Sequence, residues 1–206
     1  MSSVALLVIA KEPLPGRAKT RLTPPFSAAQ AASLAGAALL DTLEVVARTP
    51  ASRRVLVFSG DGRRWQLPGF ELVPQRGRGL GERLAAAFHD VASPALLVGM
   101  DTPQLTPALL LDGMRALSGD NADAVLGRAE DGGYWSVGFK AAPRGAFDAV
   151  PMSTSRTWAA QRDRFTDLGL RVHQQPPLRD VDTVDDALAV AAAAPATRFA
   201  RTLAAI

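Results

Sequence analysis

Hydrophobic and polar positions alternate in blocks along this chain, and the blocks follow two different periods. Runs of consecutive apolar and β-branched residues, such as VALLVIA at 4–10 and PALLVGMD at 94–101, predict strands buried on both faces. Between them lie longer stretches with apolar residues at helical spacing, the first at 27–48. Ser27 and Gln30 stand three residues apart at its start, as in a capping box. Strands and helices are therefore expected to alternate.

The rest of the chain continues this alternation. Residues 122–139 predict two strands joined at the hairpin sequence EDGG. Further strands are expected at 53–61, 70–75 and 170–174, and further helices at 82–92, 106–117, about 154–169, 184–194 and, in a short last piece, from Pro195. This order predicts an α/β fold, a three-layer sandwich with a mainly parallel central sheet. Residues 1–206 are expected to form a single domain, because no linker, repeat or low-complexity segment interrupts them.

The composition is that of an ordinary globular protein. The chain has 206 residues, of which 48% are hydrophobic and 21% charged. No uninterrupted apolar run reaches the roughly 18–20 residues needed to cross a bilayer, and no basic leader precedes a hydrophobic stretch. We therefore expect a cytoplasmic protein with no membrane partner. The absence of cysteine excludes disulfides, thiolate chemistry and Cys-ligated zinc.

The charge distribution argues against nucleic acid as a partner. The sequence pI is about 9.9, but the formal net charge is only +3 and basic residues are interspersed with acids. Arginine is the usual basic residue, and the chain has only three lysines, Lys11, Lys19 and Lys140. Two of them fall in the loop after the first strand, where a compact ammonium could approach a phosphate as a point charge.

That loop, AKEPLPGRAKTRLTPPFS at 10–27, concentrates positive charge on a stiff backbone. Its prolines restrict the chain, and Gly16 permits close backbone approach to a ligand. The candidate anion-binding residues are Lys11, Gly16, Arg17, Lys19 and Arg21. Loops after parallel strands lie at the edge of the sheet where ligands bind, so a phosphate-bearing ligand is expected here. The alternative is a solvated basic loop stiffened by prolines.

Acidic residues follow other strands at the same expected edge. Asp101 ends the strand at 94–101, and it is not needed as a cap, because Thr106 and Pro107 already start the next helix. Asp180 and Asp182 precede the helix at 184–194, outside its capping box. Carboxylates facing a phosphate loop suit Mg²⁺, or Mn²⁺, that bridges protein and phosphates. We expect Asp101, Asp180 and Asp182 as metal ligands, with Asp182 preferred over Asp180 as the partner of Asp101.

Further substrate contacts are expected from the loop at 76–81, the hairpin and the helix start near 153. The candidates are Arg78, Gly81, Gly133, Tyr134 and Ser153. Each has an alternative interpretation, since glycine loops are flexible by default and strand aromatics usually pack across strands. His89 and His173 have no serine or acid at a telling spacing, so both are expected to be surface or core residues.

Taken together, AKEPLPGRAKTRL, LGERLAAAF, VGMDTPQL, EDGGYWSVG and RDVDTVDDAL resemble a bacterial family called radical-SAM/selenodomain-associated transferase 1, or DUF2064. The resemblance runs in order over nearly the whole chain. It implies a nucleotide-diphospho-sugar transferase (GT-A) fold, similar in layout to guanylyltransferases of cofactor synthesis. It also implies that Lys19 reaches nucleotide phosphates, that Asp101 is the metal-binding acid of the central strand, and that Asp182 is the second acidic position. Prolines stand where related nucleotidyltransferases have glycines, so phosphate would be held by side chains.

The expected activity is a Mg²⁺-dependent transferase acting on a nucleotide or nucleotide-sugar and a small-molecule acceptor. Nucleotidyl transfer to a phosphorylated or hydroxyl acceptor is the leading hypothesis, with Lys19 and Asp101 as catalytic residues. A glycosyltransferase with a nucleotide-sugar donor is one alternative, and a non-catalytic nucleotide- or anion-binding protein is another. An RNA-binding domain is disfavoured by the dispersed charge and the lack of aromatic stacking motifs.

Overall fold

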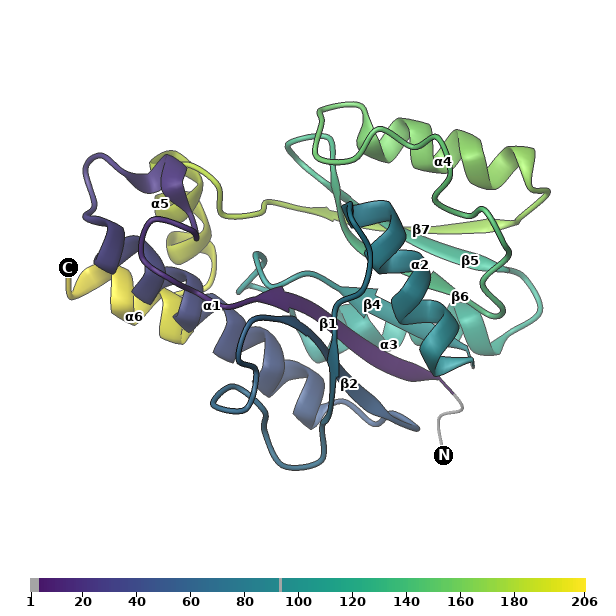
Figure 1. Ribbon diagram of the computed structural model, residues 1–206, viewed down its shortest axis with the longest axis horizontal. Coiled ribbons are helices and arrows are strands. Elements are labelled where there is room, and N and C mark those ends of the chain that lie inside the picture. Colours follow the sequence, from purple (N-terminus) through teal and green to yellow (C-terminus); the bar gives the residue numbers. More distant parts are fainter. Residues whose placement is uncertain (1–3, 93) are drawn as a thin grey trace.

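The computed structural model describes residues 4–92 and 94–206, and Figure 1 shows its elements. The strands are β1 (Ala5–Lys11), β2 (Arg54–Ser59), β3 (Glu71–Pro74), β4 (Ala95–Val98), β5 (Ala124–Ala129), β6 (Tyr134–Phe139) and β7 (Val172–Leu178). They form one sheet in the order β3-β2-β1-β4-β6-β5-β7. All pairings are parallel except those of β6, which runs antiparallel to both β4 and β5. The expected α/β fold with a mainly parallel sheet is confirmed.

Helices cover both faces of this sheet. They are α1 (Ala28–Arg48), α2 (Leu80–Val91), α3 (Pro107–Ser118), α4 (Thr157–Asp167), α5 (Val184–Ala193) and α6 (Arg198–Ala204), with a 3₁₀ turn, η1 (Thr20–Leu22), before α1. Leu39 of α1 and Met114 of α3 belong to the core cluster of one face, and Phe88 of α2 and Phe165 of α4 to that of the other. The central strands are apolar because both of their faces are buried in this way.

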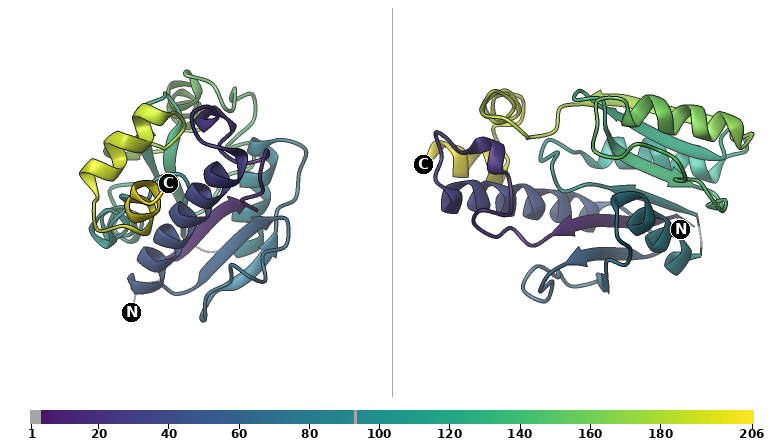
Figure 2. Two further views of the ribbon diagram at one scale, coloured as in Figure 1. Left: turned by 90° about the vertical axis from the view of Figure 1, so that its left-hand side faces the viewer. Right: turned by 45° about the horizontal axis from the view of Figure 1, so that its top comes forward.

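A third core cluster joins the last two helices to the amino-terminal half of α1. Leu34, Val190 and Phe199 pack there, beyond the end of the sheet, as the two views of Figure 2 show for α1, α5 and α6. The carboxylate of Asp41 accepts hydrogen bonds from the backbone N–H of Arg198 at 2.9 Å and of Phe199 at 2.8 Å. This contact satisfies the free N–H groups at the start of α6 and holds the C-terminal helices next to the loop after β1.

Helix α1 is long and apolar enough, by length and composition alone, to span a membrane. Two-thirds of its most apolar window, 67%, is buried inside the fold. Its alanines and leucines pack against the sheet and against α5 and α6. This burial is that of a core helix of the α/β fold.

Several element boundaries differ from the sequence prediction. Strand β4 ends at Val98, so Asp101 follows the strand and does not end it. Strand β7 continues through Pro176 and Pro177, which the expected strand at 170–174 excluded; β7 is an edge strand, where proline need not donate to a ladder. Helix α4 begins only at Thr157, because the residues before it form a turn in which Thr154 N–H donates to Thr157 Oγ1. The last helix starts after Thr197, whose hydroxyl caps it, and not at Pro195.

Candidate functional site

The basic loop leaves β1 at the carboxyl edge of the sheet and is held there by two buried anchors. Ala18 packs into the core of the sheet, and Leu22 packs into the cluster formed with α1 and the C-terminal helices. Lys19 lies between them with a backbone φ of 50°, in the left-handed region that non-glycine residues seldom adopt. The anchors and this backbone conformation direct the Lys19 side chain inward.

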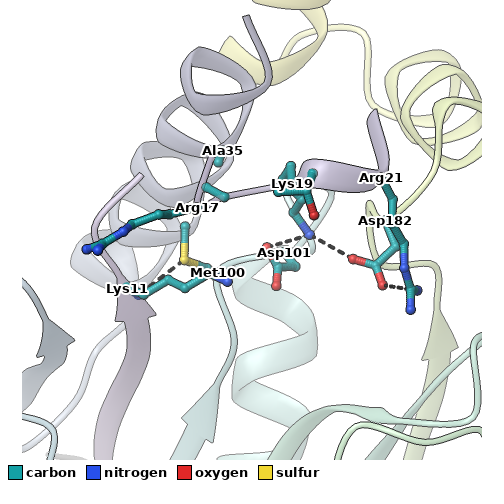
Figure 3. A pocket seen from close by; sticks show the side chains of 10 residues that line it. Lys11, Arg17, Lys19, Arg21, Ala35, Met100, Asp101 and Asp182 are labelled. Atoms are coloured by element: carbon teal, nitrogen blue, oxygen red, sulfur yellow. Dashed lines mark hydrogen bonds and ion pairs between the residues drawn. The ribbon is translucent and has the colours of Figure 1, made fainter. Parts of the chain in front are cut away.

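The ammonium of Lys19 lies between two carboxylates from distant parts of the chain. Lys19 Nζ is 2.7 Å from Asp101 Oδ1 and 3.2 Å from Asp182 Oδ1 (Figure 3). Its side chain is only 8% exposed. Burial by itself lowers the pKa of a lysine, but the two carboxylates outweigh burial here and hold the pKa of Lys19 above its ordinary value. Lys19 is therefore charged throughout the neutral range.

Asp101 and Asp182 come together because their loops are joined through the backbone. The N–H of Val181 donates to the carbonyl of Asp101 at 2.9 Å. This bond links the end of β4 to the segment before α5. Asp182 also forms an ion pair with Arg21, whose NH1 is 3.3 Å from Asp182 Oδ2. The Arg21 side chain is 75% exposed, so this second pair lies at the solvent side of the site.

These residues line a pocket of about 170 Å³ at the end of β1 and β4. The complete lining is Lys11, Arg17, Ala18, Lys19, Thr20, Arg21, Ala35, Met100, Asp101 and Asp182. Figure 3 shows Lys11 and Arg17 on the Met100 side of the pocket and Arg21 on the Asp182 side. Neither Lys11 nor Arg17 makes an ion pair with any described residue. Their charge is therefore available to an anion.

A cluster of three acids adjoins this pocket. Asp131, Asp180 and Asp182 each offer a carboxylate oxygen, and these oxygens lie within 4.8 Å of one another. Asp131 comes from the turn between β5 and β6, and its Oδ1 accepts a hydrogen bond from Gly133 N–H at 2.7 Å. Burial, and then the charge of Asp131, raises the pKa of Asp180 to about 6. We call these three residues the acidic triad.

The triad has the donor chemistry of a divalent cation site. Carboxylate oxygens are the ligands of hard cations such as Mg²⁺ and Mn²⁺. The Asp180 carboxylate is raised in pKa first by burial and then by the charge of Asp131, and a bound cation would offset both effects. By contrast, the space between Asp101 and Asp182 is taken by the Lys19 ammonium. The residues that could hold a metal ion together are thus Asp131, Asp180 and Asp182, with Asp101 held by the lysine.

The structure brings six of the sequence-based candidates into the pocket and leaves seven outside its lining. Inside are Lys11, Arg17, Lys19, Arg21 and Asp101, and Asp182 belongs to both pocket and triad; outside the lining are Gly16, Arg78, Gly81, Gly133, Tyr134, Ser153 and Asp180. Gly81 lines a separate pocket between the start of α2 and residues 147–152. Tyr134 is partly buried and packs against the core; its hydroxyl is 3.4 Å from Gln161 Oε1, and burial raises the pKa of its phenol.

Two histidines fall away from this edge, as expected. His173 Nε2 lies 2.8 Å from Asp112 Oδ2 near the start of β7, and His89 is exposed in the last turn of α2. The sequence reasoning did not select Asp131. It took EDGG as a hairpin turn whose glycines could lie against a substrate, and it had no signal for the acid beside them until the turn is placed at the carboxyl edge of the sheet.

Comparisons with known proteins identify the family and the fold. Residues 42–154 match the model of a family described as an uncharacterized protein conserved in bacteria, DUF2064. No curated protein matches the chain. A crystal structure from Desulfovibrio desulfuricans G20, provisionally described as a nucleotide-diphospho-sugar transferase, is 28% identical, with a TM-score of 0.88 over 98% of this chain and 94% of that chain.

More distant structures show the same fold. Rv0371c from Mycobacterium tuberculosis H37Rv, solved in complex with manganese, is 20% identical, with a TM-score of 0.53 over 92% of this chain and 97% of that one. CMP:2-keto-3-deoxy-manno-octonic acid synthetase, complexed with CTP, is 13% identical, with a TM-score of 0.58 over 94% and 99%. The chain therefore shares the fold of nucleotide-diphospho-sugar transferases and nucleotidyltransferases.

Proposed function

We propose, from the premise that the chain belongs to the DUF2064 family within the GT-A-like superfamily, that it is a divalent-metal-dependent transferase acting on a nucleotide or nucleotide-sugar. The observation that carries the proposal is the Lys19 ammonium, held 2.7 Å from Asp101 and 3.2 Å from Asp182 at the carboxyl edge of the sheet. Ligands of open α/β sheets bind at that edge. The pocket combines cations for phosphate with acids for a metal ion.

The basic loop would bind the phosphates of the donor. Lys11 and Arg17 carry charge that no described acid neutralises, and Lys19 and Arg21 stand beside them. Side chains must do this work, because prolines in the loop offer no N–H groups. Four cations in one loop suit a triphosphate, which carries more negative charge than a diphosphate. This favours nucleotidyl transfer over glycosyl transfer.

Asp131, Asp180 and Asp182 would hold the metal ion, Mg²⁺ or Mn²⁺. Support comes from the chemistry of the triad and from a related fold, Rv0371c, that was solved with manganese. A bound divalent ion would neutralise negative charge on phosphate oxygens near the reacting phosphorus. Asp101 would fix the position of Lys19, so that its ammonium meets the phosphates without reorganisation.

In nucleotidyl transfer an acceptor oxygen attacks the α-phosphorus of the donor. The new P–O bond forms as the bond to the β-phosphate bridge breaks, and pyrophosphate leaves with both electrons of that bond. A hydroxyl acceptor gives its proton to solvent, whereas a phosphate acceptor has none to lose. Lys19 and Arg17 would stabilise the negative charge that develops on the leaving pyrophosphate, which is where catalysis of phosphoryl chemistry chiefly acts.

A glycosyltransferase with a nucleotide-sugar donor is the second candidate. The specific observation in its favour is the Desulfovibrio desulfuricans G20 structure, which is provisionally described as a nucleotide-diphospho-sugar transferase and matches nearly the whole chain. In that reaction the same cations would stabilise a departing nucleoside diphosphate. The two reactions release different products.

Product analysis tests the proposal and separates the two reactions. The protein is incubated with Mg²⁺, a small-molecule extract as the source of acceptors, and either nucleoside triphosphates or nucleotide-sugars. Release of pyrophosphate from a triphosphate, lost in Lys19→Gln, is the expected result. Release of nucleoside diphosphate from a sugar donor would support the second candidate. Binding of a nucleotide without release of either product would favour a non-catalytic binding protein.

A further inference from the structure

Asp182 belongs to two groups of residues that have opposite charge requirements. On one side it is part of the basic pocket, where Lys19 and Arg21 hold it. On the other side it is one of the three acids of the triad. Among the described residues of the site, Asp101 contacts Lys19 but is not in the triad, and Asp131 and Asp180 are in the triad but make no ion pair with the basic loop.

Both carboxylate oxygens of Asp182 are already engaged by cations of the basic loop. Its Oδ1 is 3.2 Å from Lys19 Nζ, and its Oδ2 is 3.3 Å from Arg21 NH1. Both distances are long for charge-assisted hydrogen bonds, which are usually about 2.7–2.9 Å. A divalent cation at the triad attracts the same oxygens more strongly, because it carries twice the charge of either side chain.

Lys19 can lose Asp182 without losing its place. Its closer partner is Asp101, at 2.7 Å, and Asp101 is held by the backbone bond between its carbonyl and Val181 N–H. Arg21 has no other ion-pair partner among the described residues and is mostly exposed. If Asp182 turns toward the triad, both cations gain hydrogen-bonding capacity that points into the pocket.

We propose that Asp182 couples the two halves of the site: when a divalent cation occupies the acidic triad, Asp182 is drawn from Lys19 and Arg21, and these cations become available to phosphate. This inference rests on the proposed function and adds an order of events to it. In the absence of metal, Asp182 stays paired with Lys19 and Arg21, and this pairing lowers their affinity for phosphate. By linkage, phosphate that engages Lys19 and Arg21 also strengthens metal binding at the triad.

Lysine NMR reads this coupling directly, because the chain has only three lysines, Lys11, Lys19 and Lys140. Protein labelled with ¹³C at the lysine ε-carbons is titrated with Mg²⁺ alone, without nucleotide. We expect the Lys19 signal to shift with metal occupancy. The signal of Lys140, which is 3.8 Å from Asp120 and lies at the opposite edge of the sheet, should stay fixed.

Metal affinity, measured by calorimetry with Mn²⁺, supplies a second readout that does not depend on activity. Removing the competing cation in Lys19→Gln should tighten Mn²⁺ binding about fivefold or more, the lower end of typical couplings between sites. Arg21→Gln, an exposed change that spares the fold, should tighten it in the same direction. Arg17→Gln is the matched control, since Arg17 lines the same pocket without contacting Asp182 and therefore reports only the loss of one positive charge.

The double variant separates coupling through Asp182 from simple charge repulsion. If Lys19 opposes the metal through Asp182, the gain from Lys19→Gln disappears in an Asp182→Asn background, whereas direct repulsion would persist there. Mn²⁺ binding that leaves the Lys19 signal unmoved, with Lys19→Gln no different from Arg17→Gln, overturns the coupling and leaves the transferase proposal standing. Failure of the unaltered protein to bind Mn²⁺ or Mg²⁺ overturns both the coupling and the metal dependence of the proposed function.

Discussion

Lys19 Nζ lies 2.7 Å from Asp101 Oδ1, within a site where 8% of the lysine side chain and 44% of the aspartate side chain are exposed. The loop after β1 and the end of β4 thus meet through an ion pair that is buried on its cationic side only. Such a pair contributes to folding as well as to binding, because removing the carboxylate leaves a buried charge with poorer compensation.

Asp101→Asn should lower the free energy of unfolding by roughly 1–2 kcal/mol, less than the loss expected for a fully buried pair because Asp101 is partly solvated. Urea denaturation at neutral pH measures this change. Asp112→Asn is the matched control, because Asp112 pairs with a half-exposed histidine at the other edge of the sheet. Equal stability losses in the two variants would show that the buried Lys19–Asp101 pair contributes no more to stability than the more exposed His173–Asp112 pair.

The burial of the Tyr134 phenol predicts a loss of stability at alkaline pH. Burial raises the pKa of its phenol above the ordinary value of 10.0, so the unfolded chain releases this proton first as pH rises. Stability is therefore unaffected below about pH 10 and falls above it. Because Tyr134 is the only tyrosine, near-ultraviolet absorbance follows its ionisation alone. Tyrosinate should appear together with unfolding, and its appearance in folded protein near the ordinary pKa would contradict the burial.

The acidic triad predicts specific losses of metal affinity. Asp131→Asn and Asp180→Asn should each weaken Mn²⁺ binding at least about tenfold, since even second-layer changes around metal ligands lower affinity about 10–100-fold. Calorimetric titration measures the effect. Asp185→Asn removes an exposed acid next to the same segment but outside the triad, and it should leave the affinity nearly unchanged. A uniform response of all three variants would indicate diffuse charge attraction in place of a site.

Gly132 supports the triad by letting two segments approach closely. Its φ is 91°, and a Cβ there would lie 2.1 Å from the carbonyl oxygen of Ser155. Gly132→Ala must therefore push the turn before α4 away from the hairpin that carries Asp131, lowering both stability and Mn²⁺ affinity. Gly169→Ala is the control, because Gly169 has a similar φ of 70° with nothing near its Cβ, and it should lose only about 1–2 kcal/mol of stability from backbone strain.

Much of the fold follows from local sequence patterns. Strands β1 and β4 are continuous apolar runs, and Ser27 and Gln30 form the capping box that starts α1. The order of strands and helices then leaves few topologies, because parallel crossovers are right-handed. The edge position of β7 could not be obtained in this way. It depends on pairing with β5, and only that placement makes its two prolines acceptable.

Part of the site could also be predicted from the order of strands and helices. Parallel strands deliver their carboxyl ends to one edge, so Lys19, Asp101 and Asp182 could be expected to approach one another, though not at what distance. Asp131 was missed because it depends on β6 turning back antiparallel beside β4, a tertiary arrangement that brings a hairpin turn to the same edge. Tyr134, by contrast, is predicted to contact substrate because of its glycine neighbours, and the structure packs its partly buried ring against the core.

The central claim is that Lys19 and the adjoining acids form one pocket for a metal-bound nucleotide. Lys19→Gln and Lys140→Gln remove the same charge at opposite edges of the sheet, so they form a matched pair. Calorimetric titration of both variants and the unaltered protein with the four nucleoside triphosphates, with and without Mg²⁺, tests the claim most directly. The account predicts Mg²⁺-dependent binding that weakens about tenfold or more in Lys19→Gln, equivalent to about 1.4 kcal/mol, and is unchanged in Lys140→Gln. Nucleotide binding of equal strength in the two variants would contradict it.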